Sequence, residues 1–235
     1  MAPPAPEPTV ITLGGGFGID EDTLLDDFAL ARTGKDRPKV CFLATASGDA
    51  ALYYERFDAA MAKHDCEPSH LKLFARDSTD PREHLLSQDV IYVGGGNTAN
   101  LLAVWRVHGI DAIMREAYEA GIVLCGISAG SNCWFEASST DSFGDFRSLP
   151  DGLGLLEGSF CPHYNTEPER QKLYSEAIRA GEIPPGLALD DGALAVFTDG
   201  KLTEVRTRRT DSEGPTLYSV DGDGVEPHAA LPFSS

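Results

Sequence analysis

The sequence predicts an α/β protein with a mostly parallel β-sheet, helices on both faces of that sheet, and extra antiparallel strands at the C-terminal end. Up to about residue 185, short runs that are apolar throughout alternate with helical segments, and such strands are typical of a sheet buried on both faces. Beyond that point short runs are separated by Asp-Gly pairs, which favour hairpin turns. The length of 235 residues fits one α/β domain.

The chain begins with "MAPPAPEP" at 1–8, which is rich in proline and has neither a basic region nor a long apolar region. We therefore expect a disordered tail there and no signal peptide. The apolar run "TVITLGGG" at 9–16 is ended by glycines, as a buried strand would be. In 20–34, apolar residues recur near helical spacing, and Gly34 is placed to end the helix.

The same alternation continues along the chain. Apolar runs predict further buried strands at 39–47, 70–75, 89–97 and 121–128, and helical spacing predicts helices at 49–64, 98–109 and 109–121. A helix is expected after residue 128. The C-terminal segments "LALDDGALAVFTDGKLTEVRTRR" and "TLYSVDGDGVEPH" predict antiparallel strands at the edge of the same domain. No repeat and no long linker divides the sequence, so we expect 1–235 to be a single domain.

Composition narrows the classes of partner. The chain has 19 basic and 37 acidic residues, a formal charge of −18 and a pI near 4.6, which argues against nucleic acid and anionic membranes as partners. No window approaches the roughly 18 apolar residues that a membrane helix needs. The five cysteines are an odd number without a CxxC pair, so we expect a reducing, cytoplasmic location with no disulfide framework and no zinc site.

Two glycine-rich loops need an explanation. "GGGFGI" at 14–19 and "GGGNTAN" at 94–100 have Ile19 and Ala99 where a dinucleotide-binding G-x-G-x-x-G has its third glycine. Neither loop has the Lys-Ser/Thr of a phosphate-binding loop, so no nucleotide cofactor is predicted. At the carboxyl end of a parallel strand, however, a glycine-rich turn lets backbone N–H groups approach a developing negative charge, as in an oxyanion hole.

Ser128 is the strongest candidate for chemistry. Gly126 to Gly130 match G-x-S-x-G, with a buried strand before the serine and an expected helix after it, which is the context of a nucleophile elbow. Small neighbours are needed because the sharp turn brings backbone segments together, and the turn points the serine Oγ into the crevice beyond the strand. The alternative interpretation is that Ser128 only caps a helix.

A serine nucleophile needs a base, and the base needs an orienting acid. Four histidines precede the serine and are interpreted as surface residues: His64, His70, His84 and His108. Two follow it, His163 in "SFCPHYN" and His228 in "VEPHAA". Either could combine with Asp190 or Asp191 of "LALDDG", and the version with His228 has the chain order of α/β-hydrolases. Spacing does not separate them, but the polar tail around His228 supports a preorganised base poorly.

Four motifs together resemble one known family. "IYVGGGNTANLL", "GISAGSNCWFE", "DSFGD" and "FCPHYN" are similar, in order and spacing and over nearly the whole chain, to the peptidase E family of serine peptidases. The resemblance implies a class I glutamine amidotransferase-like α/β fold and hydrolysis of dipeptides with an N-terminal aspartate. It implies the catalytic roles of nucleophile for Ser128, base for His163 and orienting acid for Asp191, although family members vary at the acid. The oxyanion donors would be the backbone N–H of Ala129 and of Gly95 or Gly96. No metal or cofactor is implied.

Substrate contacts are less well defined by the sequence. A substrate carboxylate would need a guanidinium, and Arg170 in "TEPERQK" and Arg147 after "DSFGD" are candidates. A free N-terminal amine would need an acceptor, for which Glu136, Asp141 and Glu167 are available, and Asn97 of the "GGGN" loop is a further candidate for substrate binding. The tail "VEPHAALPFSS" is not clearly of the family's usual kind, which leaves the dipeptide specificity open.

The leading hypothesis is a cytoplasmic serine peptidase that acts on short peptides, with Asp-X dipeptides as candidate substrates. Three alternatives remain: a cyanophycinase-like hydrolase of aspartyl-arginine material, an α/β-hydrolase-type esterase that uses His228, and a non-catalytic ligand-binding protein on the same fold. A glutamine amidotransferase is disfavoured because the elbow carries serine where that class has cysteine. The sequence does not separate a monomer from a homodimer.

Overall fold

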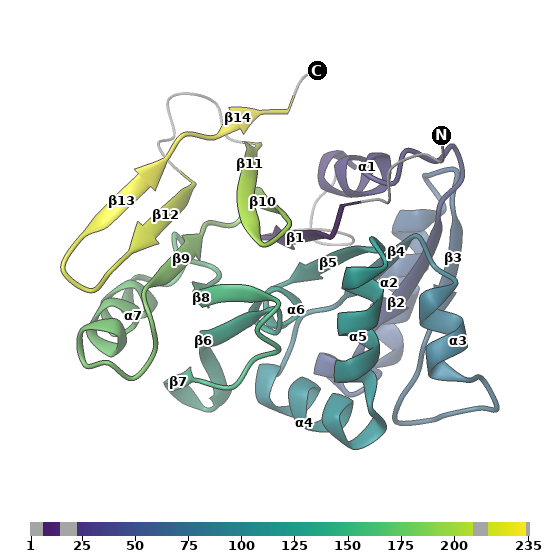
Figure 1. Ribbon diagram of the computed structural model, residues 1–235, viewed down its shortest axis with the longest axis horizontal. Coiled ribbons are helices and arrows are strands. Elements are labelled where there is room, and N and C mark those ends of the chain that lie inside the picture. The colour runs from purple at the N-terminus through teal and green to yellow at the C-terminus, as the bar shows by residue number, and fades with distance from the viewer. Residues whose placement is uncertain (1–6, 15–22, 209–215, 234–235) are drawn as a thin grey trace.

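The computed structural model describes residues 7–14, 23–208 and 216–233 of the chain (Figure 1). Most of the expected tail at 1–8, and most of the first glycine loop, lie outside the described residues. None of the helices in the described ranges is both long enough and apolar enough to cross a membrane.

The main sheet has eight strands in the order β14-β11-β10-β1-β5-β4-β2-β3. Its five parallel strands are β1 (Thr9–Leu13), β2 (Lys39–Leu43), β3 (Glu67–His70), β4 (Val90–Val93) and β5 (Val123–Ile127). On the other side of β1 the sheet continues antiparallel through β10 (Ala193–Thr198) and β11 (Lys201–Thr207), and β14 (Leu231–Pro232) pairs with β11. The prediction of a mostly parallel sheet extended by antiparallel strands is confirmed.

Helices pack on both faces of this sheet, as predicted. They are α1 (Leu24–Ala31), α2 (Ala51–Met61), α3 (Pro81–Leu86), α4 (Thr98–His108) and α5 (Ile110–Glu119). One face carries a core that α1 and α2 cover, and it includes Phe42 and Phe57, whose rings stack at 4.8 Å. The opposite face carries a core that α3, α4 and α5 cover, and it includes Leu43 and Trp105. The side chains of Phe42 and Leu43, which are successive residues of β2, thus pack in different cores, because side chains alternate between the two faces of a strand.

A second sheet of six strands stands beside the first, in the order β13-β12-β9-β8-β6-β7. Its strands are β6 (Phe135–Phe143), β7 (Asp145–Leu149), β8 (Leu156–Cys161), β9 (Gly186–Leu189), β12 (Leu217–Val220) and β13 (Val225–His228). Helix α7 (Pro168–Arg179) packs on it through a small core that includes Tyr174 and Ile178. In Figure 1 this sheet and α7 lie on the left, the parallel strands β2 to β4 with α1 to α5 lie on the right, and β10, β11 and β14 lie between them.

Several elements differ from the sequence predictions. The strand expected at 70–75 is instead β3 at Glu67–His70, and the chain after it forms a loop. The apolar residues that suggested a strand, Leu71 and Leu73, are buried from this loop, whose amides at Leu73 and Phe74 donate to the Asp49 carboxylate at 2.6 and 2.8 Å. The end of the strand expected at 39–47 is the short 3₁₀ helix η1 (Thr45–Ser47). Of the C-terminal strands, β12 and β13 join the second sheet and not the edge of the first.

Candidate active site

Strand β5 ends at Ile127, and the next residue has a backbone conformation that residues with a side chain rarely adopt. Ser128 has φ 55° and ψ −112°, and the single-turn helix α6 (Ala129–Asn132) follows it at once. A Cβ on Gly126 would lie 2.0 Å from the Gly130 carbonyl oxygen, and a Cβ on Gly130 would lie 2.2 Å from the Val93 carbonyl oxygen. Both glycines of the motif are therefore required by backbone contact, as expected for a strained strand-to-helix turn.

Hydrogen bonds fix this turn from beneath. The Ser131 hydroxyl donates to the Gly126 carbonyl at 2.6 Å and accepts from the Leu13 amide at 3.3 Å, which ties α6 to the ends of β5 and β1. The amides of Ser131 and Asn132 both donate to the Ser128 carbonyl at 2.9 Å. Because the carbonyl is held in this way, the half-buried Ser128 side chain projects from a rigid base into the crevice beyond the strands.

The second sheet supplies the other two predicted catalytic side chains. His163 follows β8 and Asp191 follows β9, and these strands are parallel neighbours, so their carboxyl ends lie at the same edge. His163 has φ 56°, again in the left-handed region that a residue with a side chain seldom adopts. Strained backbone of this kind clusters at functional sites. His163 and Asp191 are brought together by strand pairing, although α7 separates them in the chain.

The three side chains form a continuous hydrogen-bonded chain. His163 Nε2 lies 3.0 Å from Ser128 Oγ, and His163 Nδ1 lies 2.7 Å from Asp191 Oδ1. With the Nδ1 proton donated to the carboxylate, Nε2 is free to accept the serine hydroxyl proton. Asp191 is itself held in place, because its Oδ2 accepts from the Thr166 hydroxyl at 3.1 Å and its amide donates to the Asn165 side chain at 2.9 Å.

The charge state of Asp191 suits an orienting role. Burial alone would raise the pKa of this carboxyl, but the hydrogen bond and positive charge of His163 outweigh it, with help from Thr166 and Arg170. The pKa of Asp191 is therefore lowered, and its side chain stays ionised wherever the histidine needs an acceptor.

The structure also separates the competing acid and base. The neighbouring Asp190 is 1% exposed, and its Oδ2 accepts from the Tyr218 hydroxyl at 3.3 Å, so it points into the second sheet and not toward the histidine. His228 lies on β13, where its Nε2 makes a 2.7 Å hydrogen bond with the Ser219 hydroxyl. The geometry brings Asp191 and His163, and not Asp190 or His228, to Ser128.

The second glycine loop passes beside Ser128. A Cβ on Gly95 would lie 3.3 Å from the Ser128 Cβ, so the backbone reaches the serine closely only without a side chain. Gly96 has φ 136°, and a Cβ there would lie 2.4 Å from the Ala46 carbonyl oxygen. Ala129 begins α6, where the first amides have no partner within the helix. Within the described part of the chain, no hydrogen bond engages the amides of Gly95, Gly96 or Ala129.

The residues suggested for substrate binding have other partners. Asn97 caps α4 by accepting from the Asn100 amide at 2.8 Å, and its Nδ2 donates to the Ser142 carbonyl at 2.8 Å. Arg170 is only 3% exposed, and its Nε donates to Glu167 at 2.8 Å. The exposed carboxylate of Glu136 accepts from the Gly158 amide at 2.8 Å. Asn97 and Arg170 thus stabilise helix ends, and Glu136 is tied to strand β8.

The pocket in front of Ser128 has a volume of about 210 Å³ and is lined by Tyr53, Arg56, Gly95, Gly96, Ile127, Ser128 and His163. Tyr53 and Arg56 come from α2 and were not among the residues that the sequence suggested. Their spacing, three residues apart on a helix that follows strand β2, was the available signal, because such a helix starts at the carboxyl edge of the sheet.

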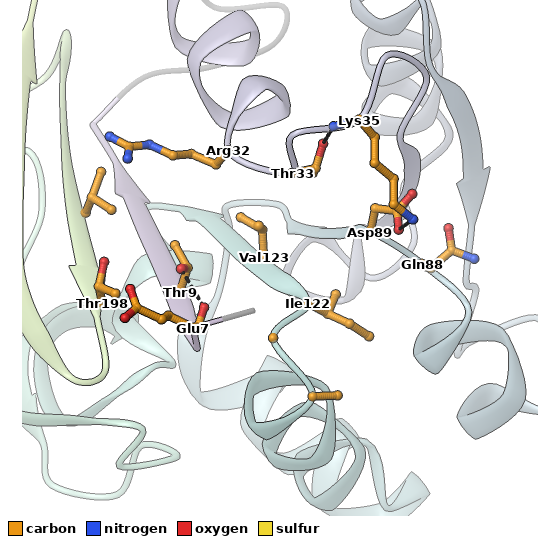
Figure 2. Close-up of a pocket in the computed structure, with 13 residues that line it drawn as sticks. Glu7, Thr9, Arg32, Thr33, Lys35, Gln88, Asp89, Ile122, Val123 and Thr198 are labelled. Atoms are coloured by element: carbon orange, nitrogen blue, oxygen red, sulfur yellow. Dashed lines mark hydrogen bonds and ion pairs between the residues drawn. The ribbon is translucent and has the colours of Figure 1, made fainter. Parts of the chain in front are cut away.

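A larger pocket of about 490 Å³ lies at the opposite, amino-terminal edge of the sheet, beside Thr9 and Val123 (Figure 2). Lys35 Nζ lies 2.6 Å from the Asp89 carboxylate within this pocket, and Arg32 forms an ion pair with Glu204, which lies outside the lining. Among the described residues its lining has threonine hydroxyls but no histidine, so none of these hydroxyls has a neighbouring base like the one beside Ser128. Size therefore does not identify the reactive pocket in this protein.

Metal chemistry has little support in the described ranges, where no three histidine, cysteine or acidic side chains gather as a metal site would require. All five cysteines are free and buried: Cys41, Cys66, Cys125, Cys133 and Cys161. Burial raises the pKa of every one of these thiols, to about 12 for Cys41 and Cys161. Cys125, three residues before the nucleophile, belongs to the core and not to the site.

Comparison with known proteins identifies the family of the chain. The model of peptidase family S51 matches residues 10–205. An uncharacterized peptidase, YgaJ, of Bacillus subtilis (strain 168) is 46% identical over 214 residues, which are 91% of this chain and 93% of that protein. Peptidase E of Shewanella amazonensis is 31% identical over 137 residues, 54% of this chain and 58% of the relative. The crystal structure of a peptidase from an acI-B1 Actinobacterium shares the fold, with a TM-score of 0.74, 15% identity and 96% of each chain covered. The chain belongs to peptidase family S51 and is a serine-type peptidase.

Proposed function

We propose that this peptidase hydrolyses short peptides, Asp-X dipeptides among them, through a Ser128–His163–Asp191 triad and an acyl-enzyme intermediate. The observation that carries the proposal is the hydrogen-bonded chain of 3.0 and 2.7 Å that links the three side chains at a strained turn. Peptidase E is also the name of several relatives of the chain. The small volume in front of the serine favours a substrate of few residues, since sites for drug-sized ligands are typically larger.

In the acylation step, the Ser128 Oγ–H gives its proton to His163 Nε2 as Oγ attacks the carbonyl carbon of the scissile bond. A carbon–oxygen bond forms, and negative charge develops on the carbonyl oxygen. That charge is stabilised by the amides of Ala129 and of Gly95 or Gly96, which lie next to the serine. The tetrahedral intermediate then collapses: the C–N bond breaks, and protonated His163 gives its proton to the leaving amine.

Deacylation repeats this chemistry with water. His163 takes a proton from a water molecule that attacks the acyl-enzyme carbonyl, and then returns the proton to Ser128 as the acid product leaves. Asp191 keeps the imidazole in the required tautomer throughout and stabilises its protonated form. These steps need only groups of the protein and water. The free cysteines are consistent with action in the reducing cytoplasm.

The proposal is tested with purified protein and a series of dipeptides that includes Asp-X and neutral controls. Ser128→Ala and His163→Ala should each lower kcat by about 10⁴-fold or more, because the nucleophile and the base act as one unit. His228→Ala is the matched histidine control, and it should leave kcat/KM unchanged because its ring pairs with Ser219.

Four results would contradict the proposal. Full activity in the Ser128 variant would show that Ser128 is not the nucleophile. Loss of activity in the His228 variant, but not in the His163 variant, would show that His228 is the base. Efficient cleavage of a p-nitrophenyl ester without cleavage of any peptide would favour an esterase. Cleavage of aspartyl-arginine material in preference to all dipeptides would instead favour the cyanophycinase-like alternative.

A further inference from the structure

Arg56 is the one residue with a permanent charge in the lining of the pocket in front of Ser128, as far as the described residues define that pocket. It lies on α2, one turn beyond Tyr53, so both side chains come from the same face of the helix. The lining contains no aspartate or glutamate. The whole chain has a formal charge of −18, but the only side chains of this described lining that can carry a charge near neutral pH are a guanidinium and an imidazole. The pocket is therefore more basic than the rest of the protein.

The fold holds Arg56 beside the glycine loop at 94–97, which contains the proposed oxyanion donors Gly95 and Gly96. The segment that leads into α2 contacts that loop directly: the Asn97 amide donates to the Ala46 carbonyl at 2.8 Å, and a Cβ on Gly96 would collide with the same carbonyl. Behind Arg56, its helix neighbour Phe57 is fully buried and stacked on Phe42. The backbone under the guanidinium is therefore anchored on two sides.

The guanidinium itself remains available. Among the residues that the structure places, no carboxylate or carbonyl forms a hydrogen bond or ion pair with Arg56. This differs from Arg170, which the sequence suggested as a carboxylate anchor but which is buried, paired with Glu167 and packed 4.2 Å from the centre of the Phe146 ring. A buried and paired arginine cannot readily turn toward a substrate, whereas an exposed arginine in the pocket wall can.

We propose that Arg56 binds a carboxylate of the peptide substrate and thereby selects short acidic peptides or peptides with a nearby free C-terminus. The inference rests on the proposed function, because it assumes that a peptide occupies the pocket. The planar guanidinium can donate two parallel hydrogen bonds to one carboxylate, which fixes orientation as well as charge. The carboxylate has two sources, an aspartate side chain at the N-terminal residue or the α-carboxylate of a dipeptide, and both lie within a residue of the scissile bond.

Four matched substrates separate the two sources: Asp-Leu, Asn-Leu, Asp-leucinamide and Asn-leucinamide. For the wild type, kcat/KM should be about tenfold to a hundredfold higher when the recognised carboxylate is present than when its amide replaces it. Arg56→Gln should bring that ratio close to one, and the change should appear mainly in KM because the contact exists before the transition state. Arg56→Lys should retain part of the preference, since it keeps the charge without the bidentate geometry.

Arg37→Gln is the matched control. Arg37 is 62% exposed and precedes β2, at the edge of the sheet away from Ser128, so its loss should leave all four kcat/KM values unchanged. A preference that survives Arg56→Gln would overturn the assignment, and so would a wild type that treats the carboxylates and the amides alike.

A direct binding measurement keeps this test separate from catalysis. Calorimetric titration of the four dipeptides into Ser128→Ala should give the same preference for the carboxylate, and the Ser128→Ala, Arg56→Gln double variant should lose it. If Ser128→Ala still hydrolyses peptides, the proposed function fails whatever Arg56 does. If Ser128→Ala is inactive but binds all four peptides equally, or binds none, only the role of Arg56 fails.

Discussion

Replacing Gly130 by alanine should misalign the active site without removing any catalytic group. The added Cβ would lie 2.2 Å from the carbonyl oxygen of Val93, at the end of β4. Real contacts of this kind are not shorter than 3.0 Å, so α6 and the end of β4 must separate by about 0.8 Å. Ala129 moves with α6, while the Gly95 loop continues directly from β4. The two halves of the proposed oxyanion hole would therefore move apart.

The size of the effect follows from that displacement. A misplacement of about 1 Å in a catalytic constellation costs roughly a hundredfold in rate, or about 2.7 kcal/mol in activation free energy. We therefore expect kcat to fall about a hundredfold in Gly130→Ala, with a smaller change in KM. The free energy of unfolding should fall by about 1–3 kcal/mol, as for other overpacked sites. Steady-state kinetics on a dipeptide and urea denaturation measure the two quantities.

Gly224→Ala is the matched control, because its Cβ would meet only the Asp221 carboxylate at an ordinary 3.6 Å, in the turn between β12 and β13. It should change neither kcat nor the free energy of unfolding appreciably. The reasoning is refuted if Gly130→Ala folds with its stability intact and keeps kcat within about threefold of the wild type, since the backbone would then absorb the clash without moving the oxyanion donors.

Two further predictions follow from the site and the core. Asp191→Asn should lower kcat about 10⁴-fold, because an amide that donates to His163 Nδ1 leaves Nε2 protonated and unable to accept from Ser128. Since the pKa of Asp191 is lowered, its stabilisation is complete above about pH 4 and is lost as the pH falls through the native pKa. The free energies of unfolding of the wild type and of Asp191→Asn, measured by urea denaturation, should therefore become equal in acid. A difference that does not change with pH would refute this. None of the five thiols should react with a disulfide reagent at neutral pH before unfolding, and a fast-reacting thiol would contradict their burial.

The main sheet could be predicted because its central strands are apolar on both faces, which is a local signal. Strand β3 could not be predicted, because "EPSH" is polar and contains Pro68, which is tolerated there since the strand pairs on one side only. The second sheet was missed for a related reason. Its strand β6 buries Ser138, Ser139 and Thr140, so hydrophobic periodicity does not mark it, and its partner β8 is not adjacent in the chain.

At the site, Ser128 was predictable because an elbow is a local structure with its own glycine spacing. The choice between Asp190 and Asp191 was not predictable from spacing, since two adjacent residues point in opposite directions and only the fold decides which one meets His163. Arg56 belongs to no motif, and its spacing from Tyr53 indicates only a shared helix face. Its nearness to Ser128 depends on how α2 packs over the sheet, which a single sequence does not specify.

The division of the proposed triad between two sheets predicts how the enzyme would lose activity. His163 and Asp191 directly follow paired strands of one sheet, whereas Ser128 directly follows a strand of the other. We therefore expect a small displacement between the sheets to open the 3.0 Å serine–histidine contact before the histidine–aspartate contact. Inactivation by mild heat or denaturant should then precede loss of secondary structure. A ligand that contacts only Arg56 and the glycine loop at 94–97 would not prevent this inactivation, because it would not connect the two sheets.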